Sequence, residues 1–75
     1  MNYEAEVVRF RLGLVVHELK AVVFELKTLR TFVAGLGEDW VEFTTYLENA
    51  LDDLELALGE LSWLHGSMGK QGEAR

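Results

Sequence analysis

The chain has 75 residues, a formal net charge of −6, a hydrophobic content of 49%, and neither cysteine nor proline. A chain this short buries too small a share of its surface for an easy single core, so small domains usually need a disulfide, a metal or association as reinforcement. The lack of cysteine excludes disulfides and thiolate metal sites. The negative charge argues against binding to nucleic acid or to an anionic membrane surface. We therefore expect one domain that association stabilises.

The amino-terminal end is acidic rather than basic, which is not typical of a signal peptide. No apolar run approaches the roughly 20 residues that span a membrane. The sequence therefore predicts a cytoplasmic protein without a membrane segment.

A regular apolar pattern predicts a first helix over residues 3–34. Its members, the first seam, are Ala5, Val8, Leu12, Val15, Leu19, Val22, Leu26, Leu29, Val33 and Leu36. The steps alternate between 3 and 4, which places these side chains on one helix face at the repeat of coiled-coil packing. Gly35 and Gly37 come at the end of the pattern and predict a turn over about 35–38.

A second pattern of the same kind predicts a helix over residues 39–67. This second seam consists of Trp40, Phe43, Leu47, Ala50, Leu54, Ala57, Leu61, Leu64 and Met68, with Leu51 and Leu58 widening it. Asp39 and Glu42 have the spacing of a capping box at its start. Residues 70–75 are polar and are expected to form a frayed tail outside the hairpin of residues 1–69.

So short a connection permits only an antiparallel pair of helices. The expected fold is all-α: an antiparallel two-helix hairpin that dimerises into a four-helix bundle. In the expected register, Gly13 lies near Gly59, and small residues of one seam face branched residues of the other.

The first helix carries a further stripe, here named the outer stripe, nearly opposite the first seam. Its members are Tyr3, Val7, Phe10, Leu14, His17, Ala21 and Phe24. A helix that is apolar on two opposed faces is normally buried on both, and soluble monomers seldom expose a long apolar patch. We expect the stripe to mediate self-association in a symmetric homodimer. The alternative is that it docks a different protein. His17 is then either an ordinary interface histidine or a pH-sensitive group.

The second half of the chain is acidic throughout. Residues 38–69 contain eight carboxylates and no Lys or Arg. On the predicted helix, the candidate partner-binding residues are Glu48, Asp52, Asp53, Glu55, Leu56 and Trp63. The acids either keep an apolar protein soluble or attract a basic protein partner. A divalent metal is disfavoured, because hard cations need more oxygen ligands than one helix face offers.

No motif for catalysis is present: the sequence has no Gly-rich phosphate loop, nucleophile elbow or metal-ligand constellation. We expect a non-enzyme without cofactor or metal that binds neither nucleic acid nor membrane. The predicted function is that of a small interaction protein, adaptor- or chaperone-like, that self-associates and binds a protein partner. The alternative is a small phage-type inhibitor or nucleic-acid mimic that blocks the basic groove of an enzyme through the acidic face of the second helix.

Overall fold

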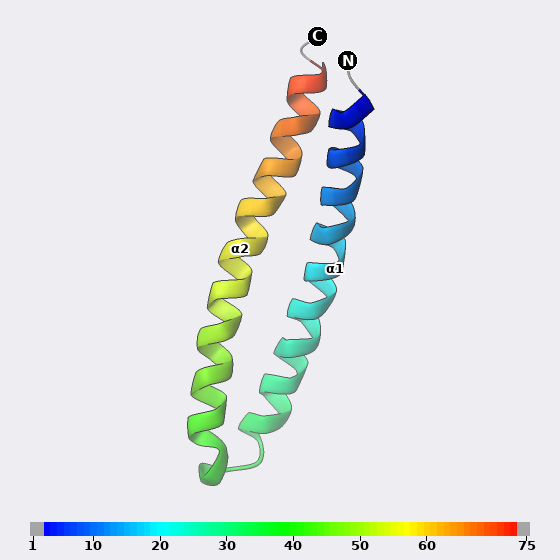
Figure 1. Cartoon of the computed structure of the whole chain (residues 1–75). Coiled ribbons are helices and arrows are strands. Elements are labelled where there is room, and N and C mark those ends of the chain that lie inside the picture. The colour runs from blue at the N-terminus through cyan, green and yellow to red at the C-terminus, as the bar shows by residue number, and fades with distance from the viewer. Residues whose placement is uncertain (1–2, 74–75) are drawn as a thin grey trace.

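The predicted all-helical hairpin is confirmed. The computed structural model describes the backbone of residues 3–73 and the side chains of residues 3–69. Helix α1 spans Tyr3–Ala34, a short 3₁₀ helix η1 spans Glu38–Trp40, and α2 spans Val41–Glu73. The two long helices run antiparallel side by side, with the turn at one end and the start of α1 and the end of α2 at the other (Figure 1). The hairpin is a rod of 56 × 15 × 14 Å.

The turn requires a glycine at one position. The amide of Gly35 donates to the carbonyl oxygens of Thr31 and Phe32, and the amide of Leu36 donates to that of Val33, which closes the last turn of α1. Gly37 follows with φ of 105°, a conformation that residues with a side chain rarely adopt. Its carbonyl accepts from the amide of Trp40, and the chain then enters α2.

The second helix differs from its expected bounds. It starts at Val41 rather than at residue 39, because η1 takes up Asp39, the residue expected to cap it. It also continues to Glu73, beyond the expected end at residue 67. Residues 70–73 of the expected frayed tail therefore have helical backbone, and residues 74–75 lie outside the described part of the chain.

The register between the helices also differs from the expected one. A Cβ atom added to Gly13 would lie 3.0 Å from Nε2 of His65, so Gly13 faces His65, while a Cβ atom on Gly59 would meet nothing within 4 Å. The facing residue is thus more than one helical turn further along α2 than expected. The 3₁₀ turn accounts for part of this shift, because it adds Asp39 and Trp40 to the connection expected over residues 35–38.

The hairpin core is narrow and contains about half of the first predicted seam and most of the widened second seam. The buried apolar side chains are Val16, Val23 and Val33 of α1 and Leu51 of α2, and Leu51 is 0% exposed. Half-buried residues continue the same two lines: Leu12, Leu19, Leu26 and Arg30 on α1, and Leu47, Leu54, Leu58, Leu61, His65 and Met68 on α2. Half of the first seam is therefore not in the core: Val8, Val15, Val22, Leu29 and Leu36 are between 41% and 54% exposed.

Leu51 is the side chain whose loss should most weaken the hairpin. We expect Leu51→Ala to lower the free energy of unfolding by about 2–5 kcal/mol, because it removes transfer energy and leaves a cavity. Leu56→Ala is the matched control, since Leu56 is 67% exposed, and it should change stability by less than about 0.5 kcal/mol. Urea unfolding followed by circular dichroism at fixed chain concentration measures both. Equal effects would contradict the assignment of the core.

Two glycine substitutions should act with opposite signs. Gly37→Ala should lower the free energy of unfolding by about 1–3 kcal/mol, because alanine is strained at the backbone angles of this turn. Gly59→Ala should raise it by about 0.5–1 kcal/mol, because Gly59 lies within α2 with open space around it. The same urea experiment measures both variants, and a stabilising Gly37→Ala would show that the turn has another conformation.

Candidate protein-binding surfaces

The outer stripe of α1 is uncovered in the hairpin. Tyr3 is 79% exposed, Phe10 67% and Phe24 71%, while Leu14, His17 and Ala21 are also exposed and Val7 is half-buried. Exposed aromatic rings on the side away from the core match the stripe's predicted place on α1. Its role in self-association stays a prediction.

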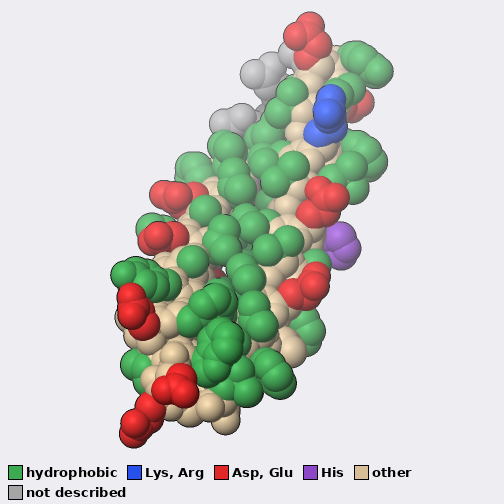
Figure 2. Space-filling model, turned by 60° about the horizontal axis from the view of Figure 1, so that its bottom comes forward, with side chains coloured by type: hydrophobic (Ala, Val, Ile, Leu, Met, Phe, Trp, Pro, Cys, Tyr) green, Lys and Arg blue, Asp and Glu red, His purple; other side chains and the backbone are tan. Residues whose placement is uncertain are grey.

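A second apolar surface, which sequence reasoning missed, extends over both helices and is here named the two-helix face. Its members are Val8, Val15, Val22, Leu29 and Leu36 of the α1 side, and Trp40, Phe43, Ala50, Ala57 and Leu64 of the η1–α2 side. Of these, Ala57 is half-buried and the others are exposed. Figure 2 shows hydrophobic side chains gathered along both helices and over the line between them. This surface is continuous because it is built from the exposed halves of the two predicted seams.

Helix geometry explains why these residues share one side of the hairpin. On each helix, most of these residues come three positions after a core residue and so lie about 60° from it on the helix surface. Viewed from one end of an antiparallel pair, residue numbers advance clockwise round one helix and counterclockwise round the other, so the positions that follow the core by three lie on the same side of the pair. Val15, which follows Leu12, and Leu64, which follows Leu61, are examples.

Carboxylates line both edges of the two-helix face. On α1, Arg11, Glu18 and Glu25 each come three residues after a member of the face, and on α2 so do Asp53 and Glu60. A step of three residues turns about 60° further round a helix, which places these exposed side chains at the edge. Figure 2 shows acidic side chains along both edges and a basic group on the α1 edge.

On the opposite side of the hairpin, an ion pair joins the two helices. Nζ of Lys27 lies 2.8 Å from Oε2 of Glu55, with both side chains 44% exposed. An ion pair with this much exposure to solvent contributes little to stability. It does mark this side as polar, so the hairpin has one apolar side and one charged side.

The acidic residues proposed for partner binding do not all converge. A shallow hollow of about 610 Å³ is lined by Glu55, Leu56, Gly59, Glu60, Trp63 and Leu64. Trp63 is 72% exposed. The structure thus brings Glu55, Leu56 and Trp63 together at this hollow. Glu48 and Asp52 are exposed elsewhere on α2, and Asp53 lies at the edge of the two-helix face.

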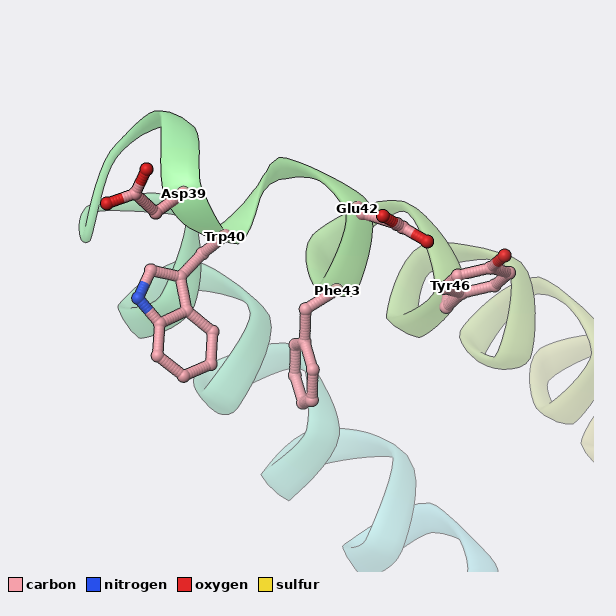
Figure 3. A pocket seen from close by; sticks show the side chains of 5 residues that line it. All are labelled: Asp39, Trp40, Glu42, Phe43 and Tyr46. Atoms are coloured by element: carbon pink, nitrogen blue, oxygen red, sulfur yellow. The ribbon is translucent and has the colours of Figure 1, made fainter.

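A second hollow, of about 530 Å³, lies beside the turn and was also missed. It is lined by Asp39, Trp40, Glu42, Phe43 and Tyr46 (Figure 3). The rings of Trp40 and Phe43 meet edge to face, with centroids 5.6 Å apart at 79°, an arrangement that aromatic pairs favour. Sequence reasoning assigned both rings to the hairpin interface. The structure leaves both rings near half exposed, with Trp40 in η1 and Phe43 in the first turn of α2.

The described residues contain no group of three or more His, Cys, Asp or Glu side chains placed to hold a metal ion. Within the same part of the chain, neither helix has the length and apolar character that crossing a membrane requires.

Comparison of the chain with protein-family models, with curated proteins and with solved structures found no match.

Proposed function

We propose that this chain is a non-enzymatic interaction module that self-associates into a four-helix bundle and uses the surface left over to bind a protein partner. The supporting observation is the imbalance between what the hairpin buries and what it exposes. Among the described residues, the buried apolar side chains are Val16, Val23, Val33 and Leu51. Large apolar side chains on two further surfaces are exposed, in excess of what soluble monomers tolerate.

The size of the apolar surplus supports association rather than a specialised ligand site. A single small hairpin gains too little from its core to be stable alone. Adding two more helices on its apolar side would give each helix a second neighbour, which is the arrangement of a four-helix bundle. The two hollows are shallow depressions at the surface of the rod, not enclosed pockets for a small molecule.

The mass of the purified chain in solution tests this proposal. We expect light scattering to give twice the chain mass of 8.5 kDa at high concentration, with helical content falling when dilution separates the copies. The physical reason is that a lone hairpin exposes most of its apolar side chains. A chain that stays monomeric and fully helical across the dilution series would contradict self-association.

Two paired variants separate the candidate surfaces for self-association. Phe10→Asp with Phe24→Asp places charge on the outer stripe, whereas Val15→Asp with Val22→Asp places it on the two-helix face. A buried unpaired charge prevents association, so the pair that produces monomers identifies the interface. The pair that leaves the dimer intact identifies the surface free for another protein.

A second candidate function is inhibition of an enzyme with a basic groove. The observation in its favour is the uniformly acidic character of residues 38–69, with Trp63 and Leu56 exposed beside Glu55 and Glu60 at the hollow on α2. An exposed tryptophan within a charged surface is typical of the anchors that dominate protein interfaces. Carboxylates around it would attract a basic groove over a distance.

Charge reversal tests the inhibitor function. Asp52→Lys with Asp53→Lys should abolish capture of a basic enzyme from a lysate, because the attraction is electrostatic, and wild-type capture should weaken as salt is raised. Glu55 is left unchanged, since it pairs with Lys27. The captured enzyme should also lose activity on nucleic acid when the wild-type chain is added. Equal capture by wild type and variant, or capture without inhibition, would count against this function.

A further inference from the structure

We infer that the two-helix face binds a second copy of this chain, with α1 packed antiparallel on α1 of that copy around a two-fold axis perpendicular to the helices. This inference rests on the proposed self-association and adds its surface and geometry. The outer stripe of α1 then remains exposed on the finished dimer, as the surface for a different protein.

The area of the two-helix face suits a stable dimer. The side of the hairpin that carries this face, with its charged edges, measures 56 Å by 15 Å, a projected area on the order of 800 Å² per copy. Standard stable interfaces bury about that much on each partner. The outer stripe belongs to one helix alone and offers a narrower contact. Packing two hairpins through the two-helix face also gives each helix two neighbours.

The spacing along α1 favours a two-fold axis at its midpoint. The face residues Val8, Val15, Val22 and Leu29 are spaced evenly about the middle of Tyr3–Ala34. Antiparallel pairing about that point places Val8 opposite Leu29 of the second copy and Val15 opposite Val22. Every apolar layer then meets an apolar layer, and α1 is covered along its length.

The charges at the edge select this arrangement over the main alternative. With the axis at the midpoint of α1, Arg11 lies opposite Glu25 of the second copy, and this pair occurs twice. Like charges then meet only close to the axis, where Glu18 and Glu60 each approach their own counterparts. Opposite charges at an interface favour the correct pairing over competing ones.

The alternative places the axis along the hairpin, so that α1 packs on α2 of the second copy. Because Gly13 faces His65, Glu18 is level with Glu60, and Glu25 is level with Asp53. Both pairs are acidic, and symmetry would repeat each of them. Four like-charge contacts at the edge therefore oppose this arrangement.

Cross-linking of single-cysteine variants tests the geometry, because the natural chain has no cysteine. A mixture of Val15→Cys and Val22→Cys chains should form a covalent dimer on oxidation, whereas neither variant should do so alone, since like positions lie about 10 Å apart along the helix. A mixture of Val22→Cys and Ala57→Cys is the matched control for the alternative arrangement and should not cross-link. Circular dichroism checks that each variant keeps its helical content.

The outcomes distinguish this inference from the proposed function. Cross-linking in the first mixture supports the inferred dimer. Cross-linking in the Val22 and Ala57 mixture, or a dimer by light scattering that cross-links in neither mixture, overturns the geometry and leaves self-association standing. A chain that is monomeric by light scattering overturns both.

A charge exchange provides an independent check. Arg11→Glu should weaken the dimer about tenfold, because two ion pairs become two like-charge contacts. Adding Glu25→Arg should restore the affinity. Arg11→Glu with Glu48→Arg is the control, since it has the same net charge but no restored pair. Equal rescue by both double variants would show a net-charge effect alone and would overturn the inferred contact.

Discussion

The two helices bury apolar side chains at a single interface with each other, and the other apolar surfaces of the hairpin follow from that constraint. Helix α1 is apolar on its core line, on its side of the two-helix face and along the outer stripe, but α2 covers only the first of these. Among residues 3–69, the hairpin consequently buries four apolar side chains and exposes many large ones. The single hairpin therefore has a defined secondary structure but an incomplete hydrophobic core. In the proposed dimer, association would supply the burial that the single hairpin lacks.

The distribution of charge determines which exposed side is suited to burial. Lys27 and Glu55 place an ion pair across one side of the helix pair. Among the described residues, the other side has apolar side chains between its edges, and carboxylates begin where the apolar strip ends (Figure 2). In the proposed dimer, such an arrangement leaves an apolar central strip for the second copy and charged edges in contact with water.

The hairpin itself was predictable because the evidence for it is local. Periodic apolar residues, the absence of proline, and Gly35 and Gly37 near the middle of the chain together indicate two helices and a turn. The rotation of the helices was not predictable in the same way. Val15 and Val16 both belong to series with steps of 3 and 4, and periodicity cannot say which of two adjacent series faces the neighbouring helix. The pairing of Gly13 with His65 was missed in part because η1 adds Asp39 and Trp40 to the expected turn. The exposed ring of Phe43 reflects the rotation of α2, because Phe43 belongs to the exposed half of the second seam.

The segregation of charge along the chain also divides it into two regions for a protease that cleaves after Lys or Arg. Every cleavage site outside the carboxyl-terminal residues 70–75 lies on α1, the last of them at Arg30, and none lies between there and Lys70. Digestion therefore releases residues 31–70, which include most of α2 and both tryptophans, as one fragment. Protection from cleavage at the sites up to Arg30 reports on α1. Arg11, at the edge of the two-helix face, and Lys27, on the charged side, supply two positions at which one digestion compares the opposite sides of the hairpin.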